Sequence, residues 1–230
     1  MKVGIIGAME EEVNILRDQI KKRSKMYLSG AEIDSGLLGG VEILLIKSGI
    51  GKVLAALSTT LLINLYKINI LINIGSAGGL HPELKIGDIV ISSAVQYHDV
   101  DVTTYGCQLG QVPNCPFTFQ ADHNLITIAE SCIQKLSLFS IRGIIVTGDT
   151  FIQGNEPLQR IRYYFPKAIA VDMEAAAIGH VCHQSNIPFI IIRSISDFSN
   201  KNSPSNFHRF LKEAAQKSSL VVENILACLI

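Results

Sequence analysis

The 230-residue sequence contains no tryptophan, few charged residues and no excess of charge of either sign. Its 20 lysines and arginines balance 20 aspartates and glutamates, so no cationic surface for nucleic acid is expected. No apolar stretch approaches the length of a membrane span, and the acidic run at positions 10–12 ends the first apolar stretch too early for a signal peptide. These absences predict a soluble, cytoplasmic protein that binds neither membrane nor nucleic acid.

The five cysteines lack the close spacing that is typical of metal sites. They are odd in number and contain no CxxC pair, so we expect free thiols, most of them buried. His180 and His183 flank Cys182 on a predicted helix, but no further His or carboxylate pattern completes a set of four ligands. The sequence therefore predicts no metal and no cofactor.

Short apolar segments rich in β-branched residues alternate with helical patterns along the chain. Near-continuous apolar strands are typical of a sheet that is covered on both faces. We expect strands at residues 3–6, 41–46, 68–74, 88–92, 143–146, 168–171 and 189–195. Helices are expected at residues 10–21, 52–66, 121–136 and 206–229, and a hairpin should join 31–35 to 41–46. The pattern predicts one α/β domain over residues 1–230, a three-layer α/β/α sandwich with a central mixed β-sheet.

Carboxylates follow directly on three of these apolar segments. They lie at positions 10–12, at Asp172 and Glu174, and at Asp197. Ligands bind at the carboxyl edge of parallel sheets, so carboxylates at three strand ends indicate an acid/base site. An acid also stabilises the N-terminus of a helix, and this simpler reason explains any one of them equally well.

Glycine-containing segments exclude two phosphate-binding motifs. Residues 4–7 do not form a GxGxxG signature, and residues 49–52 lack the upstream glycine and the following Ser or Thr of a P-loop. The small-residue segment 75–79 follows a strong strand and is expected to be a loop. Such a loop either lets the backbone approach a ligand or forms a tight turn, and the pattern does not separate these alternatives.

Six ordered motifs resemble those of bacterial 5′-methylthioadenosine/S-adenosylhomocysteine nucleosidases, within the purine nucleoside phosphorylase superfamily. The resemblance runs from the first strand to the last helix and implies a phosphorylase/nucleosidase-like fold. It also implies hydrolysis of methylthioadenosine and S-adenosylhomocysteine, and of 5′-deoxyadenosine, to adenine and the 5-substituted ribose in methionine salvage. The motifs are residues 4–12, 48–52, 73–79, 148–152, 171–175 and 194–197.

The resemblance assigns the two catalytic roles to Asp197 and Glu12. Asp197 would protonate N7 of the leaving adenine, which requires a proton on the acid near neutral pH, and Ser196 would position it. Glu12 would activate water, while Ser76 and Arg193 would orient the water and Glu174. A solvated loop aspartate is the simpler interpretation of Asp197, whereas Arg193 within an apolar strand needs a partner if it is buried.

The remaining implied contacts surround the adenine nucleoside. Glu174 and the Met173 backbone would hold the ribose hydroxyls, and Gly78 lies in the segment that approaches the ligand. Phe151 would stack on adenine and the Ile152 backbone would pair with its edge, although a phenylalanine is more often simply part of the core. The 5′ substituent would contact apolar side chains, namely Met9, Ile50, Val102, Tyr105 and Phe207.

The sequence departs from the family at Asp172, where Glu is more usual, and at Cys107, where a bulkier aromatic is common. We expect little effect of Asp172, whereas Cys107 leaves the preferred 5′ group open. Alternatives are an aminofutalosine nucleosidase of menaquinone synthesis, a purine nucleoside phosphorylase and a non-catalytic nucleoside-binding module. A phosphorylase needs arginines for phosphate, but the first loop is acidic and Asn73 stands where related phosphorylases have Arg.

The sequence also predicts a partner subunit. The helix at 52–66 is apolar on nearly all faces, and one sheet covers only one side of it. The segment 98–119 lacks a clear period yet is apolar and aromatic, which argues against disorder. The resemblance implies a homodimer in which the loop around Pro113 reaches into the neighbour's 5′ pocket.

Overall fold

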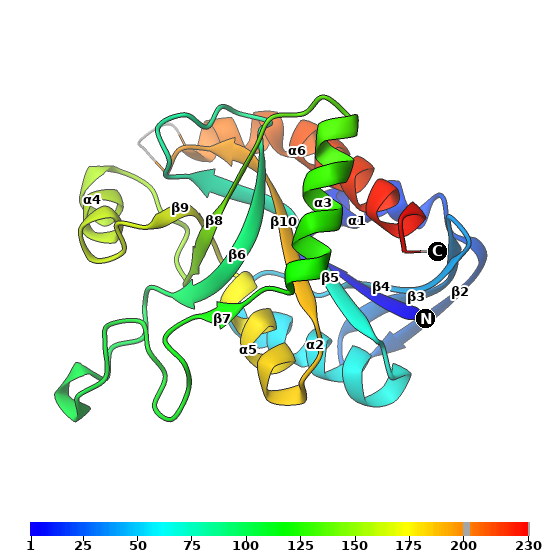
Figure 1. The fold of residues 1–230 in the computed structure, drawn as a ribbon, viewed down its shortest axis with the longest axis horizontal. Helices are drawn as coiled ribbons and strands as arrows, with labels where there is room; N and C mark the ends of the chain where they lie inside the picture. The colour runs from blue at the N-terminus through cyan, green and yellow to red at the C-terminus, as the bar shows by residue number, and fades with distance from the viewer. Residues whose placement is uncertain (200–202, 230) are drawn as a thin grey trace.

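The computed structural model describes residues 1–199 and 203–229. Strands from this part of the chain form one mixed sheet with helices on both faces, which confirms the predicted α/β class (Figure 1). The strands are β1 (Lys2–Gly7), β2 (Lys21–Leu28), β3 (Ala31–Leu38), β4 (Val41–Lys47), β5 (Ile70–Gly79), β6 (Ile89–Tyr97), β7 (Phe119–Gln120), β8 (Ser140–Thr147), β9 (Ala168–Asp172) and β10 (Phe189–Asp197).

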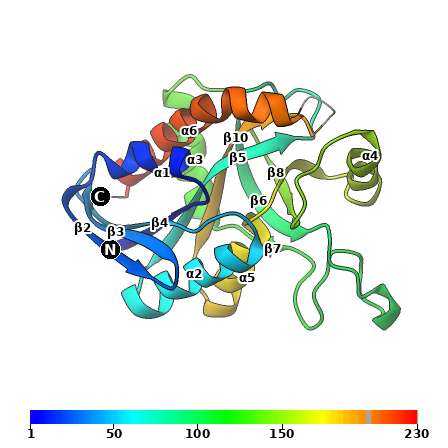
Figure 2. The ribbon, with the colours of Figure 1, turned by 180° about the vertical axis from the view of Figure 1, so that it is seen from behind.

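The helices form a layer on each face of the sheet. One layer holds α1 (Glu10–Arg17), α3 (His123–Lys135) and α6 (Ser203–Ala227), and the other holds α2 (Lys52–Tyr66) and α5 (Ala175–Ser185) (Figures 1 and 2). Helix α4 (Asn155–Tyr164) lies beyond the end of β9. Val3 and Ile5 of β1 enter the core under the first layer and Ile6 the core under the second, because successive strand residues point to opposite faces. None of the described helices combines the length and the hydropathy needed to span a membrane.

The sheet curls so far that β10, which stands at one end of the strand order, also pairs with β5 in the middle of it. Strand β5 therefore has three neighbours. Strand β5 lies parallel to β1 and β10 and also forms a short antiparallel pairing with β9. Strands β5, β10, β6, β8 and β9 are therefore joined in a closed ring. Gly78 of β5 is paired with Val171 on one side and Asp197 on the other. The curl thus brings the ends of β9 and β10 to the same point of the sheet.

The structure differs from the sequence-based expectations in several elements. Helix α1 ends at Arg17 rather than at residue 21, because the chain turns at residues 18–20 and already begins β2 at Lys21. Strand β2 was not expected, since it is an exposed edge strand whose charged residues show no apolar period. Segment 75–79 is not a loop but the end of β5, held by β9 and β10. The hairpin of β3 and β4 is confirmed.

The expectation that most cysteines are buried is also wrong. Only Cys132 and Cys182 are buried, while Cys107 and Cys115 are half-buried and Cys228 is exposed. Cys107 and Cys115 lie on the long segment between β6 and β7. The apolar composition of this segment predicted burial, but within one chain it stays partly exposed to solvent.

Candidate active site

A cavity of about 430 Å³ opens at the ends of β1, β5, β9 and β10, beside the N-terminal part of α6. The predicted site residues that line it are Met9, Glu12, Ile50, Ser76, Gly78, Phe151, Met173, Glu174, Ser196, Asp197 and Phe207. The lining residues to which the sequence analysis assigned no catalytic or binding contact are Ala8, Ala77, Val171, Asp172 and His208. The three groups of carboxylates recognised at strand ends therefore share one cavity.

Glu12 is buried in the first turn of α1, and each of its carboxylate oxygens accepts hydrogen bonds from two donors. Oε2 accepts from the backbone N–H groups of Ala8 at 2.8 Å and Met9 at 3.1 Å. Oε1 accepts from Ser76, from the backbone N–H at 3.0 Å and from Oγ at 3.2 Å. Donors from two strand ends thus fix both oxygens at the cavity wall. A carboxylate held in this way can receive a proton from a water in the cavity.

Gly75 makes room for Glu12 and for the Arg193 guanidinium. A Cβ on Gly75 would overlap the guanidinium and lie 2.8 Å from Glu12 Oε1. No side chain fits there, because real Cβ contacts are not this short. The glycine is needed for this close approach and for its φ of +153°, and the groups that approach are side chains of this chain itself.

Arg193 is fully buried in β10 and pairs with two carboxylates. Its Nη2 lies 2.5 Å from Asp172 Oδ2 and 3.3 Å from Glu174 Oε2, and it also donates to Asn73 Oδ1 at 2.9 Å. Burial acts to lower the pKa of Arg193, but the charges of Asp172, Glu174 and Glu12 outweigh it and raise the pKa. The expected partner is therefore present. The guanidinium stands behind Glu174, outside the cavity lining.

Asp172 has a structural role that sequence reasoning did not assign. Besides pairing with Arg193, it accepts from Thr147 Oγ1 at 2.5 Å and from the Ala175 backbone N–H at 3.1 Å. The second bond satisfies a free N–H at the start of α5. Asp172 thus joins β8, β10 and α5 at the wall of the cavity.

Glu174 lies between this buried cluster and the cavity. Its Oε1 accepts from the Gly51 backbone N–H at 3.0 Å, at the start of α2. Burial raises the pKa of Glu174 to about 7, and the charges of Asp172 and Glu12 act in the same direction, against Arg193 and the Gly51 N–H. Glu174 therefore changes its charge near neutral pH, inside the cavity.

Asp197 is the last residue of β10 and is buried where β10 pairs with Gly78 of β5. Its Oδ1 accepts from the Ser199 backbone N–H at 2.8 Å, and its Oδ2 lies 3.1 Å from Ser196 Oγ, which is a donor. The alternative of a solvated loop aspartate is wrong, because only 3% of Asp197 is exposed. Its carboxyl group is fixed at the cavity wall and can exchange a proton with a bound ligand.

Apolar side chains form the remainder of the wall. Phe151 lies on the loop between β8 and α4, and its ring meets that of Phe207 edge to face at 5.7 Å between centroids. Phe151 is 39% exposed, so the interpretation as a core residue is wrong. Ile152 is buried and lines a small adjoining hollow together with Phe151 and Asp197. Two aromatic rings beside a carboxyl group suit a flat ring that carries nitrogen atoms.

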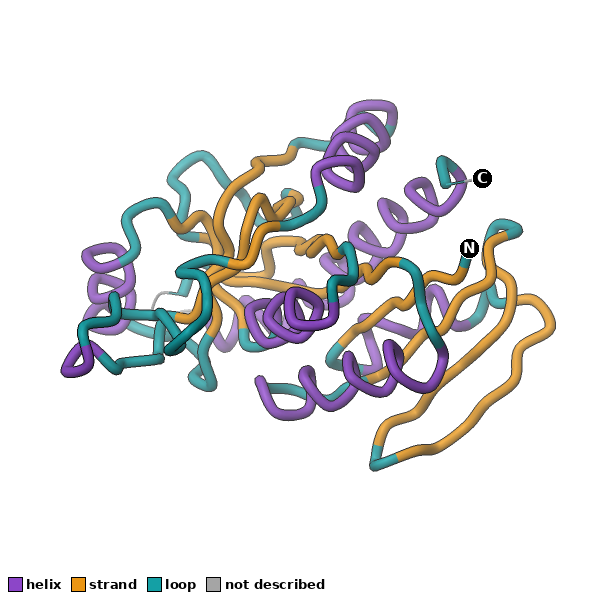
Figure 3. The backbone as a smooth tube through the Cα atoms, turned by 60° about the horizontal axis from the view of Figure 1, so that its bottom comes forward, coloured by secondary structure: helices purple, strands orange, loops and turns teal. Residues whose placement is uncertain are grey.

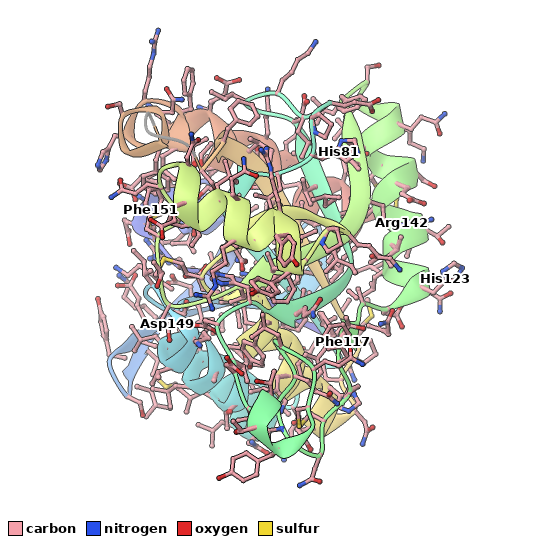
Figure 4. The ribbon with its side chains drawn as sticks, turned by 90° about the vertical axis from the view of Figure 1, so that its left-hand side faces the viewer. His81, Phe117, His123, Arg142, Asp149 and Phe151 are labelled. Carbon is pink, nitrogen blue, oxygen red and sulfur yellow. The ribbon has the colours of Figure 1, made fainter. Side chains whose placement is uncertain are left out.

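The loop that carries Phe151 is fastened to the start of α2. Asp149 Oδ1 accepts from the Lys52 backbone N–H at 2.8 Å, and Lys52 Nζ lies 2.6 Å from Asp99 Oδ2. The same Asp99 oxygen accepts from the Asp149 backbone N–H at 3.0 Å. Figure 4 shows Asp149 and Phe151 along one side of the molecule, close to α2 and α4. Two consecutive N–H groups at the start of α2 thus bind both parts of the site: that of Gly51 binds Glu174, and that of Lys52 binds the loop of Phe151.

Val102, Tyr105 and Pro113 do not line the cavity of their own chain. They belong to the long segment between β6 and β7, which projects away from the sheet (Figure 3). Pro113 is exposed, and the Tyr105 side chain is 85% exposed. Their implied contact with a 5′ substituent therefore stays a prediction that depends on a second copy of the chain.

His180 makes contacts other than those of a metal ligand. Its Nδ1 lies 3.2 Å from Tyr97 Oη and its Nε2 lies 3.3 Å from Cys115 Sγ, while its ring stacks on Phe119. Within residues 1–199 and 203–229, no three His, Cys, Asp or Glu side chains group as metal ligands.

Two partners of Arg193 that the sequence analysis did not assign to it had left a signal in the sequence. Asn73 and Asp172 interrupt or end apolar strands, and a buried polar group needs partners. Asn73 Nδ2 donates to the Ile6 carbonyl at 2.8 Å, while its Oδ1 binds Arg193. Polar residues within or at the end of apolar strands, here Asn73, Asp172 and Arg193, could thus have been predicted to form one buried cluster. His208 left no such signal.

Comparison with known proteins agrees with this geometry. The family model described as the phosphorylase superfamily matches residues 2–227. A methylthioadenosine/S-adenosylhomocysteine nucleosidase from Colwellia psychrerythraea, solved with adenine, is 44% identical, with a TM-score of 0.96 over 98% of this chain and 94% of that one. The enzyme from Neisseria meningitidis, in complex with methylthio-immucillin-A, is 40% identical, with a TM-score of 0.97 over 99% of each chain.

A futalosine hydrolase from Helicobacter pylori is also similar, with 29% identity and a TM-score of 0.94 over 98% of this chain and 97% of that one. Its fold is shared, but its identity is lower than that of the nucleosidases above. Together with the carboxylate-lined cavity, these matches show that the chain belongs to the phosphorylase superfamily and, within it, to the 5′-methylthioadenosine/S-adenosylhomocysteine nucleosidases, which are N-glycosyl hydrolases.

Proposed function

We propose that this nucleosidase hydrolyses 5′-methylthioadenosine and S-adenosylhomocysteine, and also 5′-deoxyadenosine, in methionine salvage in the cytoplasm. The observation that carries the proposal is the pair of buried carboxyl groups, Glu12 and Asp197, in one cavity with an aromatic wall. The cavity of about 430 Å³ has the size of a small-molecule site. The related enzymes solved with adenine and with methylthio-immucillin-A support an adenine nucleoside as the ligand.

Asp197 acts on the leaving base. As the bond between C1′ of the sugar and N9 of adenine breaks, both of its electrons move into the purine. Asp197 donates a proton to N7, so that neutral adenine leaves. Ser196, 3.1 Å from Asp197 Oδ2, holds the carboxyl group in place. Phe151 stacks on the base and the Ile152 backbone pairs with its edge, which positions N7 against the acid.

Glu12 acts on the water. The water oxygen bonds to C1′ while the Glu12 carboxylate takes its proton, and the product is the 5-substituted ribose. The donors from Ser76, Ala8 and Met9 fix Glu12 and so define where that water lies. The arrangement of two carboxyl groups on either side of the sugar is the usual logic of glycoside hydrolysis.

Glu174 supports the sugar as positive charge develops on it. Its ionised carboxylate accepts hydrogen bonds from the ribose hydroxyls, and Met173 contributes its backbone. A negative charge near the cationic transition state lowers the activation barrier. Arg193 holds Glu174 from behind at 3.3 Å and keeps this carboxylate directed at the sugar.

Water rather than phosphate is the nucleophile in this proposal. Phosphate would need cationic partners, but the cavity is lined by the carboxylates of Glu12, Asp172, Glu174 and Asp197. The nearby guanidinium of Arg193 is already engaged by two of them. The ionised carboxylates among them would repel a phosphate dianion.

The test is adenine release in phosphate-free buffer from methylthioadenosine, S-adenosylhomocysteine and 5′-deoxyadenosine, with mass detection of the sugar product. Free 5-methylthioribose is expected. A strict requirement for phosphate, with a ribose 1-phosphate product, would contradict hydrolysis. Inosine analogues are expected to be poor substrates, because Asp197 and the Ile152 backbone read the edge that carries the 6-amino group.

Aminofutalosine is the second candidate substrate, supported by the similarity to the Helicobacter pylori futalosine hydrolase. The catalytic carboxylates would serve it equally well, because only the 5′ substituent differs. Including aminofutalosine in the same assay separates the two functions. A higher kcat/KM for aminofutalosine than for methylthioadenosine would favour the second.

We also propose that the enzyme is a homodimer whose partner completes the 5′ pocket. Two apolar side chains of α2 are largely exposed, Val53 at 76% and Leu65 at 59%. Ile50, which lines the cavity, is 53% exposed. Burying these side chains against a second copy would be favourable. Replacing Val112 and Pro113 by aspartate is expected to weaken binding of 5′-alkylthio ligands. A fully active monomer by light scattering at assay concentration would refute the proposal.

A further inference from the structure

Cys132 and Cys228 lie side by side on two helices that are far apart in the sequence. Their sulfur atoms are 3.6 Å apart although the residues are separated by 96 positions. Cys132 is buried within α3, and Cys228 directly follows the last residue of α6. Neither residue contacts the cavity, and the nucleosidase reaction uses neither of them.

The local geometry allows these two sulfur atoms to move together. A disulfide bond requires a separation of about 2.05 Å, so an approach of about 1.5 Å is needed. Cys228 is exposed and lies in a turn beyond the helix, where its backbone N–H donates only to the Ile225 carbonyl at 3.0 Å. The end of α6 can therefore adjust without breaking the helical hydrogen bonds before it.

We propose that Cys132 and Cys228 are an oxidisable dithiol that closes to an intramolecular disulfide and fastens the end of α6 to α3. The oxidant is a small-molecule disulfide such as oxidised glutathione. The Cys228 thiolate attacks one sulfur of the oxidant, which forms a mixed disulfide and releases one thiolate. The Cys132 thiolate then attacks Cys228 Sγ, the mixed disulfide breaks, and the second thiolate leaves. Two electrons pass from the cysteines to the oxidant, and the two leaving thiolates take up the two protons.

Exposure decides the order of attack. Cys228 is open to an oxidant, whereas Cys132 is 1% exposed. Burial, with the neighbouring Cys228 thiol, raises the pKa of Cys132 to about 11, so Cys132 is a poor first nucleophile. Once Cys228 carries the mixed disulfide, its sulfur lies beside Cys132, and the second step becomes intramolecular.

The bond would strengthen the fold and leave the chemistry unchanged. It would close a loop of about a hundred residues, which restricts the unfolded chain strongly. Helix α6 also carries Phe207 at the cavity, but Phe207 is about 20 residues from Cys228, or about 30 Å along a helix. Val222 and Ile225 already anchor this end of α6 in the core, so closure would not displace the wall of the cavity.

The experiment treats the full-length protein with oxidised glutathione and maps its thiols by mass spectrometry under non-reducing conditions. We expect a loss of 2 Da, a linked peptide pair containing Cys132 and Cys228, and two fewer free thiols out of five. The Tm should rise by about 5–10 °C and return when dithiothreitol is added. Turnover of methylthioadenosine at 25 °C should change by less than about twofold, while the half-life at elevated temperature lengthens.

Three variants separate this bond from other thiol chemistry. Cys228→Ser and Cys132→Ser should each abolish both the 2 Da loss and the rise in Tm, while each reduced variant still folds. Cys107→Ser removes a half-buried thiol that is not part of the proposed disulfide. On oxidation this variant should show the same 2 Da loss and the same rise in Tm as the unmodified protein. A stable glutathione adduct on Cys228 without closure, or a disulfide-linked dimer through Cys228, would overturn the proposal. An oxidised protein with the bond but an unchanged or lower Tm would overturn the stabilising role.

Discussion

Replacing Glu174 by glutamine should change the pH dependence of stability by an amount that the structure determines. Burial raises the pKa of Glu174 from 4.5 to about 7. One unit of pKa corresponds to about 1.4 kcal/mol at 25 °C, so the ionised carboxylate destabilises the folded state by about 3 kcal/mol at alkaline pH. The folded chain holds this proton more tightly than the unfolded chain does.

The sign follows from this difference in proton binding. Between pH 4.5 and 7 the folded state carries more protons than the unfolded state, so the free energy of unfolding falls as the pH rises through this window. The contribution is constant below and above it. Glu174→Gln has nearly the same shape but no ionisation, so its advantage over the unmodified protein should grow by about 3 kcal/mol between pH 4.5 and about pH 8.

Urea denaturation of the ligand-free proteins at several pH values measures this directly. The quantity of interest is the difference in the free energy of unfolding between variant and unmodified protein at each pH, because contributions from groups that do not interact with Glu174 cancel. Glu11→Gln is the matched control, since it removes an exposed carboxylate from the start of α1, away from the cavity. A difference for Glu174→Gln that stays flat with pH would refute the argument that burial governs this group.

Four further substitutions test the site. Glu12→Gln and Asp197→Asn should each lower kcat by about 10²–10⁴-fold while adenine still binds and the circular dichroism spectrum is unchanged; near-normal turnover would remove that residue from catalysis. Gly75→Ala should lower the Tm, because its methyl group overlaps Arg193 and approaches Glu12, and overpacking costs about 1–3 kcal/mol; an unchanged Tm and activity would contradict the close approach. Asp149→Asn should raise KM about two- to fivefold with a smaller effect on kcat, because it removes the half-exposed ion pair between Asp149 Oδ2 and Lys52 Nζ at 3.6 Å but keeps an oxygen that can accept from the Lys52 N–H.

The sequence alone predicted the α/β class, the mixed sheet and the hairpin of β3 and β4. Apolar strands with β-branched residues and a small-residue turn carry this information locally, so no distant contact is needed to recognise them. The family resemblance supplied the roles of Glu12 and Asp197, and the structure places both at one cavity. Their catalytic roles remain predictions until the variants are measured.

Only the tertiary structure decided which of these residues meet. Segment 75–79 is a strand because it pairs with β10, more than a hundred positions away in the sequence. Arg193 donates a hydrogen bond to Asn73, which is 120 positions away. Strand β2 formed at an exposed edge, where an apolar pattern is not required. The long segment with Val102 and Tyr105 stayed outside its own cavity. Local patterns report which face of an element is buried, whereas the partner on that face is fixed by how the whole sheet curls and closes on β5.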